Sequence, residues 1–379
     1  MKYMLQAIVD DRSDFDIRDY NDTIVRQAID VGLGPSLYRV TRQGERGVWQ
    51  DALRAQDLAA RVESLGRLDG LEEILSALPR ERAAEILWLK GISLSQRVYP
   101  EAHLRMMGDI DLLVPSALQS ALENVLHGLG YVQRSPEQSE FYTRHHHSMP
   151  FVHARKQIVV EVHTGLFPPA TRLASTELFR PESILRRRVA DEFRGFRINR
   201  LDDETELAYL ATHWINERRC FGTAVIPMLD LALLIRRQSV GFDWDGLFRD
   251  LNNTPAAPYV RVALGFLHDR VGFLLSTANR QRLAVLASRP QAVVDPWLYW
   301  MIERHALAAV TFGKFWTRNM ANVAWERLLA PNPGWANLVS LPWSLLFPPG
   351  HPRRYDLRFQ LRRLLSPMRR GGNNRSGPD

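Results

Sequence analysis

Two aspartates, one residue apart, stand directly before an apolar run in the stretch Asp109-Ile-Asp111-Leu-Leu-Val114. Because a β-strand sends alternate side chains to opposite faces, both carboxylates are expected on one face of a strand whose apolar residues enter a core. Neighbouring carboxylates repel each other unless a proton or a cation lies between them, and Mg²⁺ prefers such oxygen ligands. A D-x-D pair alone is equally compatible with a solvated strand end, so the neighbouring stretches decide between the two interpretations.

Two further stretches carry residues that would complete a cation site. Upstream, Lys90-Gly91 interrupts an apolar run that continues to Ser93; glycine lets a backbone approach a phosphate closely, and lysine supplies positive charge. Downstream, the β-branched run 157–163 carries Glu161 near its end, where a buried carboxylate needs a partner. Beside the two aspartates, Glu161 would form a triad of carboxylates able to hold two metal ions.

This order of motifs resembles that of the nucleotidyltransferase superfamily that includes DNA polymerase β. That superfamily has a strand, a glycine-containing turn, a helix, a strand with D-x-D and a third acidic residue on a later strand. More narrowly, the chain is similar to a bacterial family of uncharacterised nucleotidyltransferases over about residues 50 to 270. The motifs that carry this resemblance are Leu89-Lys90-Gly91, Tyr99, Arg105, Asp109 to Val114, Glu161-Val-His163, His213, Leu229-Asp230-Leu231-Ala232 and Trp244.

The resemblance implies an α+β fold, in which a small mixed sheet is flanked by N-terminal helices and a larger C-terminal helical region. We expect an N-terminal helical region at 1–80, a catalytic core at 81–168, a helical domain at 169–350, and a basic amphipathic helix with a tail at 351–379. Apolar spacing predicts the following elements: helices at 49–65 and 68–78, a strand at 86–90, a helix at 92–99, a hairpin with arms at 149–154 and 158–163, and mostly helices from 171 to 243.

The implied activity is metal-dependent transfer of a nucleoside monophosphate from an NTP. Asp109 and Asp111 would hold one Mg²⁺ or Mn²⁺ ion on the triphosphate, and a second ion, held also by Glu161, would activate the acceptor oxygen. Direct action of Glu161 as a general base is the alternative.

Four residues are expected around the phosphates of the NTP: Lys90, Gly91, Ser93 and Arg105. The wider superfamily has a Gly-Ser turn where this chain has Lys-Gly, which leaves open how the triphosphate is held. For Lys90 and Arg105 the alternative role is an ion pair with one of the carboxylates. Asp230, inside a predicted helix, is best interpreted as the partner of an arginine or histidine.

The distribution of charge bears on the acceptor. The net charge is +7, but eight arginines and two aspartates fall between Pro352 and Asp379, so the tail carries most of it. A nearly neutral body disfavours a polymerase that grips a long nucleic acid. We therefore expect a small-molecule, peptide or protein acceptor; the alternatives are a catalytically silent module that keeps the fold and an enzyme that modifies nucleic-acid ends.

Three consecutive histidines, His145 to His147, precede the predicted hairpin. Sequence neighbours are not expected to face one ion together, and no cysteine or regularly spaced histidine completes a tetrahedral zinc site. We expect a polar loop near the active site, in which one imidazole contacts a phosphate.

The remaining features concern location and surface contacts. A single cysteine, Cys220, together with the lack of an apolar run of membrane-spanning length, predicts a cytoplasmic protein. From about Arg354 to Met368, leucines and arginines repeat at helical spacing. This predicted helix would either pack on the protein's own core or contact an anionic surface.

Overall fold

A computed structural model of the chain describes residues 1–303 except 13, 42–47, 135–141, 143–144, 218–224, 238–241, 274 and 287–288. Beyond residue 303 it describes Leu329, Val339, Trp343 and Asp356 to Arg358. Cys220 and nearly all of the predicted basic tail helix therefore lie outside the described residues. Within them, no helix combines the length and apolar character needed to cross a lipid bilayer.

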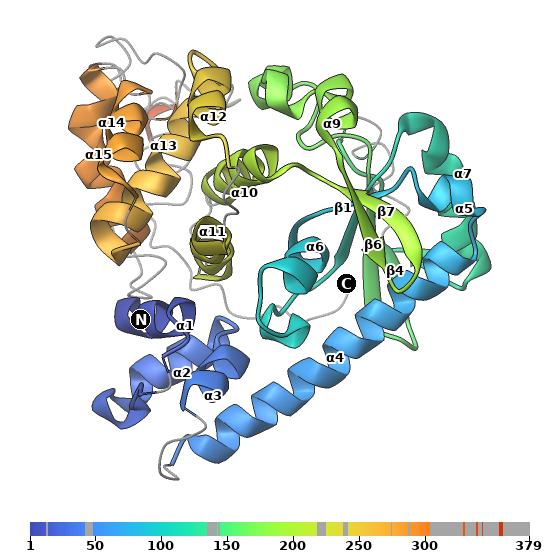
Figure 1. Ribbon diagram of the computed structural model, residues 1–379, viewed down its shortest axis with the longest axis horizontal. Helices are drawn as coiled ribbons and strands as arrows, with labels where there is room; N and C mark the ends of the chain where they lie inside the picture. The colour runs from blue at the N-terminus through green and yellow to red at the C-terminus, as the bar shows by residue number, and fades with distance from the viewer. Residues whose placement is uncertain are drawn as a thin grey trace.

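Seven strands of the described chain form one mixed sheet in the order β3-β4-β5-β2-β1-β7-β6 (Figure 1). Strand β2 runs parallel to β5 and β1 parallel to β7, whereas the other neighbours are antiparallel. The α+β fold expected from the sequence is confirmed. The strands are β1 (Leu87–Trp88), β2 (Ile110–Leu113), β3 (Val132–Gln133), β4 (Phe151–His153), β5 (Ile158–His163), β6 (Val189–Phe193) and β7 (Phe196–Arg200).

The β6–β7 hairpin is an addition to the prediction for residues 171–243, where helices dominate as expected. Phe193 pairs with Phe196 across a two-residue turn, in which Arg194 and Gly195 have φ angles of 46° and 83°. Two consecutive positive φ angles give the turn a twist that matches the twist of the strands. The hairpin joins the sheet because Leu87 of β1 pairs in parallel with Asn199 of β7.

Helix α4 (Gln50–Ser76) merges the two helices expected at 49–65 and 68–78 into one. Gly66 does not interrupt it, because a glycine inside a long helix weakens the helix without ending it. At Gly70, an added Cβ would lie 2.6 Å from Cδ1 of Ile158, so this glycine lets α4 pack closely against β5. Figure 1 shows α4 extending from the N-terminal helices to the sheet.

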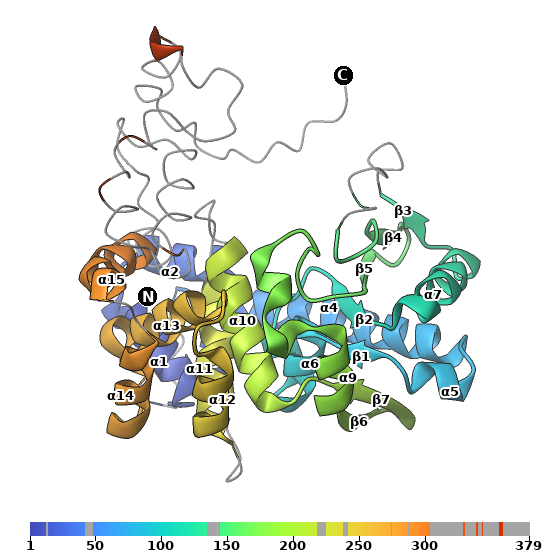
Figure 2. The same cartoon turned by 90° about the horizontal axis from the view of Figure 1, so that it is seen from above.

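Helices cover both faces of the sheet. Figures 1 and 2 place α7 (Ser116–Gly128) on one side, and α10 (Asp203–Glu217) and α11 (Val225–Arg237) on the other. The remaining helices are α1 (Lys2–Val9), α2 (Asp22–Asp30), α3 (Gly34–Thr41), α5 (Arg80–Ala83), α6 (Lys90–Arg97), α9 (Pro181–Arg187), α12 (Trp244–Leu251), α13 (Ala257–Phe266), α14 (Thr277–Val285) and α15 (Arg289–Ile302).

Alternation along β2 divides its residues between two hydrophobic cores. Ile110 and Leu112 belong to the core that also contains residues of α4 and α7, whereas Leu113 belongs to the core that the N-terminal and C-terminal helices share. Asp111 shares the face of Leu113, since side chains two residues apart point the same way. The carboxylate therefore faces the C-terminal helical half.

Candidate active site

The register of two central strands brings the predicted acidic residues together. Strands β2 and β5 pair in parallel, with Asp111 opposite Glu161 and Leu113 opposite His163. Strand alternation puts Glu161 and His163 on one face, the face of Asp111. One ligand atom from each of Asp111, Glu161 and His163 lies within 4.8 Å of the others.

Asp111 is the most enclosed carboxylate of this group, at 2% exposure. Lys90 donates from Nζ to its Oδ1 at 2.9 Å, and His163 donates from Nε2 to the same oxygen at 2.8 Å. Burial opposes ionisation, but Lys90 and His163 outweigh it and hold the pKa of Asp111 well below its usual value. Burial likewise disfavours protonated His163, yet its bond to Asp111 raises the pKa of the imidazole.

Asp109 lies at the edge of this group, directly before the first residue of β2. It is not part of the compact cluster of Asp111, Glu161 and His163. Repulsion from Asp111 and partial burial raise the pKa of Asp109 to about 7, and Lys90 only partly offsets them. The positive charge near Asp109 is therefore too weak to stabilise its ionised form.

Sequence reasoning did not assign a role to His163, although a signal was present. The E-x-H spacing puts this histidine on the same strand face as Glu161. In the structure His163 is fully buried, and its Nε2 lies 2.8 Å from Asp111 Oδ1 and 3.5 Å from Glu161 Oε2. The imidazole thus connects two of the three predicted catalytic carboxylates.

Lys90 is the first residue of α6 and has a φ of 47°, in the left-handed region that favours glycine. Lys90 pairs with Asp111, as in the alternative interpretation of this lysine as a partner in an ion pair with one of the carboxylates. An added Cβ on Gly91 would lie 3.0 Å from Met107 Cβ and 3.3 Å from Arg105 Nη1, so this glycine admits the crossing segment. Ser93 is fully buried, and its Oγ accepts from Arg97 Nε at 3.3 Å.

Arg105 is paired with a carboxylate outside the acidic cluster. It donates from Nε to Asp230 Oδ1 at 2.8 Å and from Nη2 to Asp230 Oδ2 at 2.9 Å. The hydroxyl of Tyr99 also donates to Asp230 Oδ1, at 2.6 Å. The contact with Arg105 agrees with the interpretation of Asp230 as the partner of an arginine. The apolar spacing of the sequence does not reveal the contact with Tyr99.

The three consecutive histidines lie beside the same face. A β-bridge pairs His147 with His163, and ring centroids of these two residues are 5.1 Å apart. One ring nitrogen from each of His145, His146 and His147 lies within 4.8 Å of the others. The expectation that sequence neighbours cannot face one ion is wrong, because the chain bends at His145 and His146 instead of extending.

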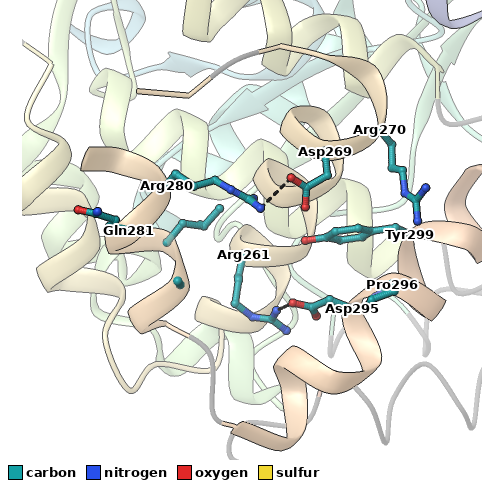
Figure 3. A pocket seen from close by; sticks show the side chains of 10 residues that line it. Arg261, Asp269, Arg270, Arg280, Gln281, Asp295, Pro296 and Tyr299 are labelled. Carbon is teal, nitrogen blue, oxygen red and sulfur yellow. Dashed lines mark hydrogen bonds and ion pairs between the residues drawn. The ribbon is translucent and has the colours of Figure 1, made fainter. Parts of the chain in front are cut away.

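A cavity of about 480 Å³ lies elsewhere, in the C-terminal helical half. Figure 3 shows its lining, in which Arg280 pairs with Asp269 and Arg261 with Asp295. Its residues come from α13 to α15 and from the π-helix Leu267–Val271. Figures 1 and 2 both place these helices at the opposite end of the molecule from the sheet, so the cavity is separate from the acidic cluster.

Comparison with known proteins agrees with the geometry. A family model described as "uncharacterised nucleotidyltransferase" matches residues 20–272, which is more than half of the chain and includes every residue of the acidic cluster. No curated protein and no solved structure matches. The chain belongs to this family of uncharacterised nucleotidyltransferases.

Proposed function

We propose that the protein uses divalent metal ions to move a nucleoside monophosphate from an NTP to a hydroxyl, phosphate or similar group on a non-nucleic-acid acceptor. The acceptor would be a small molecule, a peptide or a protein. The observation that carries this proposal is the parallel register of β2 and β5, which lays Asp111 beside Glu161 on one strand face. Membership of a nucleotidyltransferase family supports the transfer of a nucleotidyl group.

The donor set fits Mg²⁺ or Mn²⁺, because carboxylate oxygens suit hard divalent cations. The contacts that Lys90 and His163 make to Asp111 both use Oδ1, so among the described residues Oδ2 is the oxygen offered to a cation. A cation would also relieve the repulsion that disfavours ionised Asp109. Two ions held by Asp109, Asp111 and Glu161 would neutralise the triphosphate and lower the pKa of the acceptor group.

Glu161 would serve the acceptor side. Burial disfavours its charged form, but interaction with His163 holds the pKa of Glu161 below its usual value. Glu161 is therefore ionised at neutral pH, the state required both of a metal ligand and of a base that takes the acceptor's proton. His163 would orient both carboxylates, since its Nε2 lies near an oxygen of each.

The first turn of α6 would face the phosphates. Gly91 would present its backbone there, and Lys90 and Arg105 would contribute positive charge. Because these two cations are already paired with Asp111 and Asp230, they would act mainly through the field that they create. Ser93 would support the site by packing the first turn, since it is fully buried.

One observation favours a second candidate, a catalytically silent module that keeps the fold. Lys90 and His163 already compensate the negative charge of Asp111. A metal ion bound there would have the same effect. Such a protein would bind a nucleotide without turning it over. The near-neutral body, with most of the net charge in the tail, favours either function over modification of nucleic-acid ends.

The decisive experiment is incubation of the full chain with each NTP, labelled at the α-phosphate, together with Mg²⁺ or Mn²⁺ and candidate acceptors. Pyrophosphate release coupled to a mass increase of one nucleoside monophosphate on an acceptor supports the proposal. The Asp109→Asn variant should abolish both signals. Metal-dependent NTP binding with no pyrophosphate release under any condition would instead favour the silent module.

A further inference from the structure

The rings of His145, His146 and His147 form a compact cluster beside the acidic residues. Their centroids are 4.4 Å apart for the first pair, 4.8 Å for the second pair and 4.2 Å between the outer two. One ring nitrogen from each lies within 4.8 Å of the others. Zinc–nitrogen bonds are about 2.0 to 2.1 Å long, so the three nitrogens would have to move closer together to share one ion.

The hydrogen bonds of the cluster suit metal binding. His147 donates from Nδ1 to the carbonyl oxygen of Ser148 at 2.8 Å, which leaves Nε2 as the nitrogen with a lone pair. Histidines that bind metals commonly donate their other ring N–H to a backbone carbonyl in this way. His146 is 8% exposed, and its Nδ1 is buried without a hydrogen-bond partner among the described residues. A buried nitrogen without a partner is costly unless a ligand satisfies it.

The backbone fixes this cluster against the end of β5. Ser148 donates its N–H to Val162 O at 2.8 Å, and Thr164 donates its N–H to His146 O at 2.8 Å. These two bonds flank the β-bridge between His147 and His163. His146 and His147 are therefore held by sheet-like pairing, which limits the entropy lost when an ion binds.

We propose that His145, His146 and His147 bind a transition-metal ion of the class that prefers imidazole, with Zn²⁺ as the representative. Imidazole nitrogen suits Zn²⁺, Cu²⁺, Ni²⁺ and Fe²⁺, whereas carboxylates suit Mg²⁺ and Mn²⁺. The protein thus presents two neighbouring sites of different ligand chemistry. This inference stands independently of the proposed nucleotidyl transfer.

Three protein ligands leave a fourth tetrahedral position open. Nε2 of His147 lies 4.0 Å from Oε2 of Glu161, so this position adjoins the acidic cluster. A water molecule would complete the coordination. The ion would hold this water molecule beside the Glu161 carboxylate.

The test uses the full chain, stripped of metal with a chelator and then titrated with Zn²⁺ and with Co²⁺. We expect one ion per chain at this site, with the intense visible absorption of tetrahedral Co²⁺. X-ray absorption of the zinc form should show imidazole nitrogens in the first coordination shell. A shell of oxygen alone would overturn the proposal and needs no variant.

Variants locate the ion. His146→Ala, and the double variant His145→Ala/His147→Ala, should weaken Zn²⁺ binding by about tenfold or more. The matched control is His127→Ala, which removes an exposed histidine of α7 that lies against Phe151. Asp111→Asn should leave one zinc-binding event in place, since the carboxylate is not among the three nitrogen ligands.

Two outcomes would refute the assignment. Zinc binding that persists in His146→Ala but is lost in Asp111→Asn would place the ion on the carboxylates. A metal-free protein that binds inorganic phosphate through these histidines, and takes up no Zn²⁺, would make the cluster an anion site. Far-ultraviolet circular dichroism and thermal melting of each variant separate loss of the site from loss of the fold.

Discussion

Arg105 and Asp230 form a two-point ion pair that joins the segment before the D-x-D strand to helix α11, with donor–acceptor distances of 2.8 and 2.9 Å. Asp230 is 1% exposed, and Tyr99 adds a third hydrogen bond to it. Parallel bonds between a guanidinium and a carboxylate fix orientation as well as distance. The pair therefore fixes how the sheet and helix α11 are oriented relative to each other.

We predict that Arg105→Ala lowers the free energy of unfolding by about 3 to 5 kcal/mol, because it leaves a buried carboxylate without its cation. Urea unfolding measures this change. The control is Arg12→Ala, which breaks an exposed pair with Asp14 and should leave the free energy of unfolding nearly unchanged. Adding Asp230→Asn to Arg105→Ala should recover part of the loss. Equal unfolding midpoints for Arg105→Ala and Arg12→Ala would contradict a structural role for the buried pair.

Asp109 gives a prediction about pH. Its pKa is raised to about 7, so between about pH 4 and pH 7 the folded protein binds more protons at this site than the unfolded chain does. The contribution of Asp109 to stability therefore falls as pH rises through this window. In chelator, Asp109→Asn should be more stable than wild type at pH 8, by on the order of 4 kcal/mol because the pKa rises from 3.8 to about 7, and the difference should shrink towards pH 5.

The same comparison in Mg²⁺ provides the control for the pH prediction. An ion that binds wild type but not the variant stabilises only the wild-type fold. The stability advantage of Asp109→Asn over wild type at pH 8 should therefore become smaller or change sign in Mg²⁺. Thermal melting at pH 5 and pH 8, with and without Mg²⁺, measures all four conditions. A difference that does not depend on pH in chelator would show that Asp109 has an ordinary environment.

Glu161 and Asp109 are expected to differ in their roles. Glu161→Gln should reduce turnover strongly but weaken NTP binding less than Asp109→Asn does, because the third carboxylate is assigned to the acceptor side. NTP titration in the presence of metal, combined with pyrophosphate release, separates the two effects. Glu192→Gln, which changes an exposed residue of β6, is the control. Equal losses of NTP affinity in the two site variants would remove the distinction.

Lys90 combines an unusual backbone with a buried charge. We predict that Lys90→Gly is more stable than Lys90→Ala by about 1 kcal/mol, since alanine is strained in the left-handed region and glycine is not. Both variants should lose turnover, because both remove the cation that Asp111 contacts. Chemical unfolding of the two proteins side by side checks the order. A more stable alanine variant would mean that residue 90 does not hold a positive φ.

The sequence predicted the parts of the site that local pattern encodes. D-x-D before an apolar run identified β2, and a β-branched run with one acid identified β5. The turn across Arg155 to Gln157 lies where the spacing of the two arms placed it, with His153 paired to Ile158. These features depend on the alternation of apolar and polar side chains over a few residues, and this alternation can be recognised in one amino-acid sequence.

Features that depend on contacts distant in sequence were missed. The turn of the β6–β7 hairpin contains only one glycine, and two of the five positions in β6 are exposed, so apolar spacing did not indicate a strand there. The extension of α4 through residue 66 depends on its packing against β5 and α3, which local periodicity does not report. The positions of His145 to His147 follow from a bridge to β5, and this explains why an extended-chain argument failed there.

The parallel pairing of β1 with β7 has a consequence for synthesis of the chain. Residue 87 emerges from the ribosome long before residue 199, its partner in the sheet. At about 5 to 20 residues per second, β1 waits several seconds or more with one edge unpaired. An unpaired edge is a template for association with other chains. The nascent protein therefore carries this unpaired edge from the emergence of β1 until the β6–β7 hairpin has been made.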